Sequence, residues 1–148
     1  MLKSQRLTKE FMEAVGQALP HEDAPGVTGL NYKLLSSLVW EETREFAAAM
    51  SRLKSDVASG GNGKDDVGLH YWAEVIDAMC DIIVVVHNTS NAMGIDLEPF
   101  FDEVHRTNMA KVGGPIGADG KQLKPPDWEP PNIKKMLENL VFACLLYT

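Results

Sequence analysis

The sequence predicts an all-α protein, and two observations carry this prediction. Apolar residues recur at intervals of three and four through most of the chain, as they do along one face of a helix. No segment of any length alternates apolar and polar residues as a half-buried strand does. A chain of 148 residues, 45% hydrophobic and 24% charged, suits one globular domain. We therefore expect residues 1–148 to form one domain, a bundle of four to five helices.

The first half of the chain is expected to hold two helices joined by a proline- and glycine-containing loop at 20–27. The first helix spans 4–19 and ends at Pro20. The second spans 28–58, with Thr28 as its N-cap. On the first helix, the apolar stripe that we expect to face the core comprises Leu7, Phe11, Ala14, Val15 and Ala18.

Two further helices follow a polar, glycine-rich loop at 59–66. The third helix spans 68–92, and Gly94 is the residue expected to end it. Asp96 is expected to cap a fourth helix that reaches about residue 112. The short glycine-rich connection at 59–66 favours antiparallel packing of the helices on either side of it. We therefore expect the second and third helices to form a hairpin.

The segment 113–131 interrupts the helical pattern, because it carries most of the proline in the chain as well as several glycines. A loop of this length inside a compact domain is more often functional than incidental. A last helix is expected from residue 132 to the end of the sequence, and no function is assigned to it.

Charge and composition exclude several classes of partner. The net charge of −7 and the isoelectric point of about 5.0 argue against binding to a nucleic acid polymer or an anionic membrane. The longest apolar run, residues 82–86, is too short to cross a bilayer, and the N-terminus lacks the apolar core of a signal peptide. Cys80 and Cys144 lie in apolar helical patterns, as buried thiols do in a reducing compartment. We therefore expect a cytoplasmic protein.

Five acidic residues form the most informative pattern of the chain. They read EExxE and, after a spacer of 28 residues, ExxD: Glu41, Glu42, Glu45, Glu74 and Asp77. On an ideal helix Glu42 lies about 40° and Glu45 about 20° from Leu38, inside the apolar stripe, whereas Glu41 lies about 60° away, at its edge. Glu74 and Asp77 likewise interrupt the apolar stripe of the third helix, and Asp81 lies close to them.

Inward-facing acids on two neighbouring helices predict a metal site. Four carboxylates within a few ångströms of one another repel too strongly to remain ionised without a cation. Ligation by oxygen alone selects a hard ion, Mg²⁺ or, as a substitute, Mn²⁺. The alternative is that glutamate-rich helix turns are solvated faces without a role, which holds for most isolated EExxE strings. Two such motifs on two apolar stripes of one chain favour the metal site.

The paired motif resembles the hallmark of the all-α nucleoside triphosphate pyrophosphohydrolase superfamily, which includes MazG-like and phosphoribosyl-ATP pyrophosphohydrolase-like proteins. The resemblance covers roughly residues 4–132. Two segments, EVHRTNMAKVGGP and DGKQLKPPDWEPP, are similar to the phosphoribosyl-ATP pyrophosphohydrolase-like branch in particular. The resemblance implies an oligomer, a homodimer or homotetramer, with the rim of the active site completed by a neighbour.

The resemblance also implies roles for individual residues. It assigns Mg²⁺ to Glu42, Glu45, Glu74 and Asp77. Together with Glu42 and Glu45, Glu41 would act in catalysis, by touching a second metal ion or by positioning the attacking water, and Asp81 is an additional acid with a weaker claim. Asn108 and Lys111 match an NxxK segment of the family, which suggests contacts to phosphate or nucleoside.

The segment 113–131 supplies further candidates for substrate binding under this reading. Lys121 and Lys124, with Lys111, could neutralise the charge of a triphosphate, and Trp128 could stack on a base or close the pocket. The alternative is that the two loop lysines are solvated charges and that Trp128 anchors the loop on the helices.

We therefore expect a Mg²⁺-dependent nucleoside triphosphate pyrophosphohydrolase that cleaves between the α and β phosphates and releases a nucleoside monophosphate and pyrophosphate. A more specialised substrate, phosphoribosyl-ATP or a modified nucleotide, is the alternative within the same class. Two alternatives from other classes remain: a non-catalytic helical regulator that binds nucleotide or metal, and a plain oligomerisation bundle.

Overall fold

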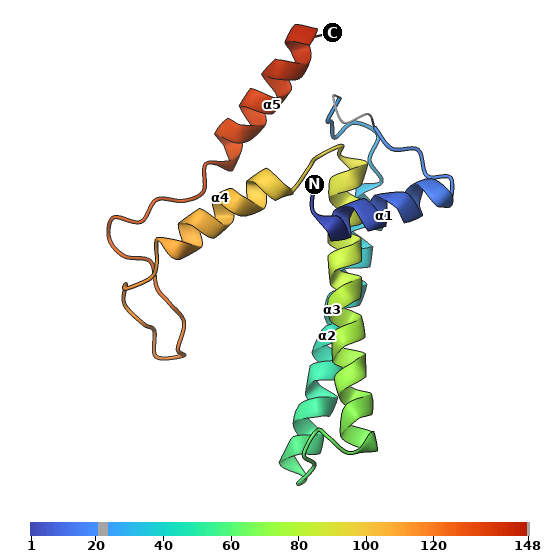
Figure 1. Cartoon of the computed structure of the whole chain (residues 1–148), viewed down its shortest axis with the longest axis vertical. Coiled ribbons are helices and arrows are strands. Elements are labelled where there is room, and N and C mark those ends of the chain that lie inside the picture. Colours follow the sequence, from blue (N-terminus) through green and yellow to red (C-terminus); the bar gives the residue numbers. More distant parts are fainter. Residues whose placement is uncertain (21–23, 148) are drawn as a thin grey trace.

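The computed structural model describes residues 1–20 and 24–147, with side chains up to residue 142, and this part of the chain holds five α-helices and no β-strand (Figure 1). The prediction of an all-α chain is confirmed. In chain order the helices are α1 (Lys3–Ala14), α2 (Tyr32–Ala58), α3 (Asp66–Ala92), α4 (Glu98–Met109) and α5 (Ile133–Tyr147). Within the described residues, none of them combines the length and the apolar character that spanning a bilayer requires.

The two longest helices, α2 and α3, form the predicted antiparallel hairpin (Figure 1). Ala49 of α2 and Val75 and Ala78 of α3 are buried where the helices meet. At the closed end of the hairpin, a Cβ atom on Gly68 would lie 2.5 Å from the Cα atom of Gly63, so the chain can turn this tightly only with glycine at position 68.

The C-terminal end of α3 agrees with the prediction, whereas the N-terminal end of α2 does not. Gly94, at φ +68°, ends α3 in a left-handed residue, and the N–H of Ile95 donates to the carbonyl of Ser90 (2.9 Å). In contrast, Thr28 does not cap α2. Asn31 does, by accepting a hydrogen bond from the N–H of Leu34 (3.1 Å). Helical geometry cannot begin earlier, because Gly29 has φ +82°.

Two other helices are shorter than predicted. Helix α1 ends at Ala14 rather than at residue 19, because Gly16, at φ +80°, reverses the chain. Helix α4 begins two residues after Asp96, whose Oδ1 accepts a hydrogen bond from the N–H of Glu98 (3.0 Å). It ends at Met109 because the next bonds are of the tighter three-residue type, from the N–H of Lys111 to the carbonyl of Asn108 (3.1 Å).

Helix α1 packs on the C-terminal half of α3 with the face opposite to the one predicted. Its buried residues are Gln5, Thr8 and Met12. The predicted apolar stripe is instead exposed, with 48% of Leu7, 60% of Phe11 and 62% of Val15 accessible, and Ala14 and Ala18 are exposed as well. The reason is that α3 presents buried polar side chains to α1, His87 and Asn91. The polar face of α1 packs against them, and the apolar face of α1 stays exposed in one chain.

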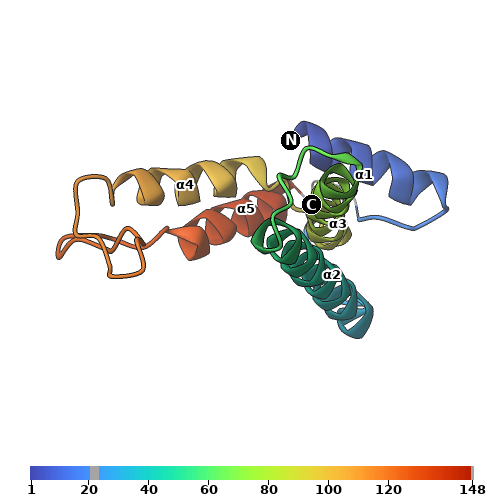
Figure 2. The same cartoon turned by 90° about the horizontal axis from the view of Figure 1, so that it is seen from below.

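Helices α4 and α5 and the segment between them form an arm that projects from the hairpin (Figures 1 and 2). Among the described residues α4 and α5 contact each other, but neither packs against α1, α2 or α3. One chain therefore does not close into a bundle, and the homo-oligomer stays a prediction.

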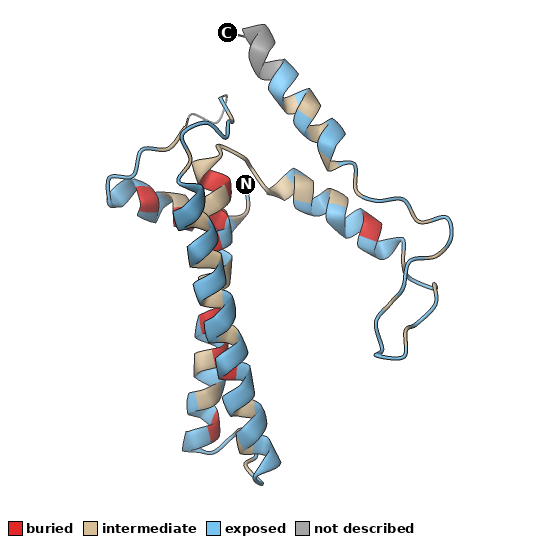
Figure 3. Ribbon diagram, turned by 180° about the vertical axis from the view of Figure 1, so that it is seen from behind, coloured by how far each residue is buried: buried red, intermediate tan, exposed pale blue. Residues whose placement is uncertain are grey.

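Little of the apolar surface is buried in one chain. Among the described residues the buried apolar side chains are few and lie in α1, α2 and α3 (Figure 3): Met12, Ala49, Val75, Ala78 and Val85. The prediction of a buried thiol at Cys80 is wrong, because Cys80 lies on an uncovered face of α3. The same prediction for Cys144 falls outside the side chains that the structure describes.

Candidate active site

The antiparallel hairpin brings acids of both motifs within electrostatic reach of one another. Glu42 of α2 is half-buried, and its pKa is raised, first because burial disfavours the charged form. The negative charges of Asp81, Glu45, Glu41 and Asp77 raise the pKa of Glu42 further, in that order. Carboxylates from α3, Asp81 and Asp77, therefore act on a carboxylate of α2.

The acids do not form a closed cluster in this structure. Glu74 is half-buried like Glu42, whereas Glu45, Asp77 and Glu41 are exposed. Within residues 1–20 and 24–142, whose side chains the structure describes, no three acidic, histidine or cysteine side chains lie close enough together to hold a metal ion.

Arg52 is a residue of this region that the sequence motifs did not reveal. Its Nε donates to Oε2 of Glu74 (2.7 Å), while Nε2 of His70 lies 3.4 Å from Oε1 of the same carboxylate. Arg52 comes from α2, so this ion pair bridges the hairpin next to the acids. The position of Arg52 in the sequence could have indicated this contact. Arg52 lies ten residues after Glu42, on the part of α2 that faces the start of α3 in an antiparallel hairpin.

The other candidate residues gather at the far end of α4. Trp128 Nε1 donates to the carbonyl of Thr107 (2.8 Å), which fastens the loop to α4. The ammonium of Lys124 lies 4.1 Å and that of Lys111 5.5 Å from the centre of the indole ring, in cation–π contact. Lys111 also donates to Oδ1 of Asn108 (2.7 Å). Trp128 thus anchors the loop here, and two ammonium groups lie against its ring, one of them bonded to Asn108.

The loop between α4 and α5 is held by further bonds. An isolated bridge pairs Ile116 with Gln122, and Lys121 is exposed at the turn that this bridge closes. Where the loop returns, Glu103 accepts two 2.8 Å bonds from Arg106 and one from the N–H of Asn132 (2.9 Å). These donors, Arg106 foremost, lower the pKa of Glu103 to about 2.

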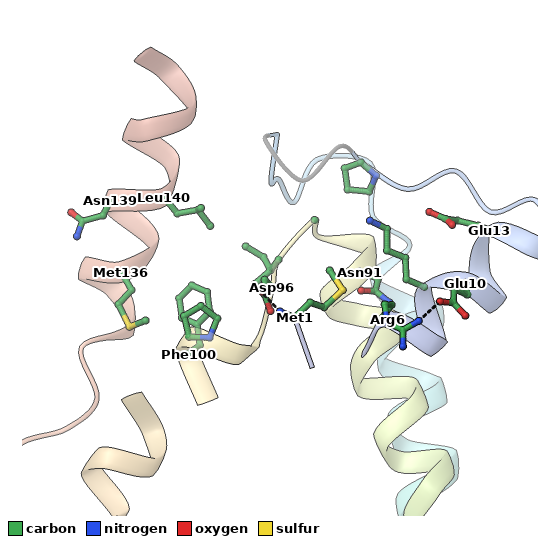
Figure 4. Close-up of a pocket in the computed structure, with 15 residues that line it drawn as sticks. Met1, Arg6, Glu10, Glu13, Asn91, Asp96, Phe100, Met136, Asn139 and Leu140 are labelled. Atoms are coloured by element: carbon green, nitrogen blue, oxygen red, sulfur yellow. Dashed lines mark hydrogen bonds and ion pairs between the residues drawn. The ribbon is translucent and has the colours of Figure 1, made fainter. Parts of the chain in front are cut away.

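The structure therefore places the predicted site residues in two separate groups. The acids lie on the α2–α3 hairpin, and the lysine–tryptophan group lies on the arm, which points away from the hairpin (Figures 1 and 2). The largest cavity found, about 860 Å³, belongs to neither group. It lies between α1, the start of α4 and α5, with Arg6 and Glu10 on one side and Phe100, Met136 and Leu140 on the other (Figure 4).

Comparison with protein families gives one match. The sequence model described as phosphoribosyl-ATP pyrophosphohydrolase matches residues 8–108, which is more than half of the chain. The chain belongs to the phosphoribosyl-ATP pyrophosphohydrolase family. A comparison with curated proteins gives no match.

Membership of the phosphoribosyl-ATP pyrophosphohydrolase family confirms the prediction of a nucleotide pyrophosphohydrolase, because the family is one of enzymes of that class. The matched residues include both acidic motifs and end at Asn108, before Lys111 and the loop. The match supports the more specialised of the two predicted substrate classes better than nucleoside triphosphates in general.

Phosphoribosyl-ATP pyrophosphohydrolases typically depend on Mg²⁺. The acidic side chains of this chain offer ligands for such an ion. Four carboxylates offer oxygen atoms alone, which suits a hard divalent cation. Burial first and neighbouring acids second raise the pKa of Glu42, and a cation among these carboxylates would offset both effects. The residues present thus fit such an ion.

Proposed function

We propose that this chain, as one domain over residues 1–148, is a Mg²⁺-dependent pyrophosphohydrolase for a nucleotide of the phosphoribosyl-ATP class. The reaction consumes one water, breaks the P–O bond between the α and β phosphates, and releases pyrophosphate and the corresponding monophosphate. One observation carries the proposal: in a chain of this family, acids of the EExxE and ExxD motifs act on Glu42 from both sides of the α2–α3 hairpin.

In this proposal Glu42, Glu45, Glu74 and Asp77 hold the ion. A bound Mg²⁺ ion supplies charge neutralisation and polarises phosphate oxygens. Glu41, exposed at the edge of the group, orients the attacking water and accepts its proton. Arg52 orients the carboxylate of Glu74 through the hydrogen bond from its Nε.

The arm supplies the phosphate contacts. Lys111 and Lys124 both lie against the Trp128 ring, and Asn108 is bonded to Lys111, so these side chains offer donors to phosphate oxygens. Lys121, at the tip of the loop, is free to swing onto the distal phosphates. Trp128 acts here through the loop that it anchors.

A second copy of the chain is needed to complete the site. The arm points away from the hairpin of its own chain (Figure 1), so its lysines reach acids only if they are those of a neighbour. Large apolar side chains support an assembly, since 69% of Trp40, 60% of Phe11 and 62% of Phe101 are accessible in one chain. We therefore propose a homodimer or homotetramer with sites built from two chains.

The proposal is tested by release of pyrophosphate from a panel of nucleotides. Phosphoribosyl-ATP and the common ribo- and deoxyribonucleoside triphosphates are incubated with the protein and Mg²⁺, and the products are followed by ³¹P NMR. We expect pyrophosphate, not orthophosphate, from phosphoribosyl-ATP, and no reaction after chelation of Mg²⁺. Faster turnover of a common triphosphate would favour the general substrate class, and no turnover of any nucleotide would overturn the function.

A further inference from the structure

One buried amide group spans the joint between α3 and α4. The side chain of Gln5, on α1, is 0% exposed. Its Nε2 donates to Oδ1 of Asn91 (3.0 Å) and to the carbonyl of Ile95 (2.6 Å), and its Oε1 accepts from the N–H of Leu97 (3.0 Å). These partners belong to the last turn of α3, the linker and the residue before α4, so a single side chain contacts all three parts of the joint.

The contact is reciprocal, which fixes α1 against the joint. Nδ2 of Asn91 donates to the backbone carbonyl of Gln5 (3.2 Å) and lies 3.7 Å from the sulfur of Met12. Asn91 is 4% exposed. Apolar helix contacts tolerate small shifts in register, whereas a fully bonded buried pair of amides accepts one arrangement only. Gln5 and Asn91 therefore define one position of α1 relative to the joint.

The direction of the arm depends on this joint rather than on packing. Neither α4 nor α5 packs against α1, α2 or α3 in the described part of the chain. The linker includes Gly94 in the left-handed region, a residue with wide backbone freedom. Asp96 pairs with the amino group of Met1 (3.0 Å; Figure 4), and Glu98 pairs with the same group (2.5 Å). Exposed pairs of this kind hold a chain weakly.

We infer that Gln5 is a positioning residue of the enzyme: by bonding Asn91, Ile95 and Leu97 it fixes the direction in which α4 leaves α3, and thereby aims the substrate-binding arm at the acids of a neighbouring chain. This role rests on the proposed function, since the arm carries Asn108, Lys111 and Lys124. Gln5 touches no substrate in this account. Its loss leaves the acids and the lysines intact and lowers the fraction of molecules whose arm is correctly aimed.

The first test measures the arm directly and does not need activity. Spin labels are placed on exposed positions of the hairpin and the arm, Lys54→Cys and Asp102→Cys, in a Cys80→Ser/Cys144→Ser background. Labelled protein is diluted with unlabelled protein, so that the distance within one chain is observed. We expect a narrow distribution of distances with Gln5 and a broad one after Gln5→Met, which keeps the volume and removes the hydrogen bonds.

Thr8→Val is the matched control. Thr8 lies one turn further along the same buried face of α1, is 5% exposed, and bonds only within its own helix, to the carbonyl of Ser4 (3.0 Å). We expect this variant to keep the narrow distribution. If Gln5→Met does not fold, Gln5→Glu replaces it, because the carboxylate keeps the acceptor for Leu97 and loses both donations. An unchanged distribution in a folded Gln5 variant would overturn the inference.

The second test separates positioning from a general loss of structure by kinetics. When a fraction of the molecules is competent to bind, the apparent dissociation constant rises in inverse proportion to that fraction. If about one molecule in ten keeps the arm aimed, KM for the nucleotide rises about tenfold. We expect kcat to change by less than about twofold, since saturating substrate restores the aimed state.

The two tests distinguish failure of this inference from failure of the proposed function. A KM unchanged in Gln5→Met, or a fall in kcat with KM constant, would overturn the positioning role even if the wild-type protein is active. A wild-type protein that hydrolyses no nucleotide would overturn the proposed function and the catalytic part of this role. The distance measurement would then still decide whether Gln5 holds the joint.

Discussion

Glu42 is the residue at which the two acidic motifs meet. Burial and the charges of acids on both helices raise its pKa, while Arg52 of α2 is paired with Glu74. A cation among these carboxylates would favour the charged form of Glu42. The chemistry of the proposed site thus appears already at a single residue, before any ligand is considered.

His87 gives a prediction at the same scale. It is 5% exposed, its Nε2 lies 2.8 Å from Oγ of Ser4, and its Nδ1 has no hydrogen-bond partner. Burial lowers the pKa of His87 below its ordinary value of 6.5. The folded state therefore binds a proton less readily than the unfolded state, and the free energy of unfolding falls as the pH drops below about 6.5.

Denaturation by urea at pH 7.5 and at pH 5.5 measures this effect. We expect the wild-type protein to be less stable at the lower pH, and His87→Gln to lose part of that difference. His105→Gln, an exposed position on α4, serves as the control and should keep the wild-type pH dependence. The same pH dependence in His87→Gln and the wild-type protein would refute the assignment.

The elements show how much of the fold could be predicted from the sequence. The hairpin of α2 and α3 could be predicted from helical periodicity and a short glycine-rich connection. The placement of the acids on these two helices could be predicted from the spacing of the two motifs. The buried face of α1 could not be predicted, because the stripe of Gln5, Thr8 and Met12 looks like a solvent face until α3 presents Asn91 and His87 to it. Periodicity identifies an apolar stripe and not the molecule that covers it.

The start of α2 supplies a prediction at the scale of the element. Asn31 caps this helix through the N–H of Leu34, whereas Thr28 lies outside it, before Gly29. Replacing an N-cap asparagine by alanine removes one hydrogen bond from the first turn, which destabilises a protein by about 1 kcal/mol.

Chemical denaturation compares Asn31→Ala with Thr28→Ala. We expect the first variant to lose about 1 kcal/mol and the second less than about 0.5 kcal/mol, the usual range for a surface substitution. The reverse order would mean that α2 begins at residue 28, as the sequence alone suggested.

The whole molecule divides the candidate site between a hairpin that carries the acids and an arm that carries Asn108, Lys111 and Lys124. This division could not be predicted from the sequence, because it depends on the direction of a joint that the buried amide of Gln5 holds. It also gives the exposed apolar surface of the chain a use. In the proposed oligomer, a second copy would cover these exposed faces and bring an arm to the acids.

The central claim is that acids from both helices jointly hold the Mg²⁺ ion that hydrolysis requires. The most direct measurement is the rate of pyrophosphate release from phosphoribosyl-ATP, as Mg²⁺ is titrated, for Glu45→Gln on α2 and Asp77→Asn on α3. Glu13→Gln, an exposed acid on α1, is the control. We predict that each site variant loses at least about 100-fold in kcat/KM, since a lost ligand removes several kcal/mol of charge stabilisation, while the control stays within about twofold. Either site variant as active as the wild-type protein over the same range of Mg²⁺ would contradict the account.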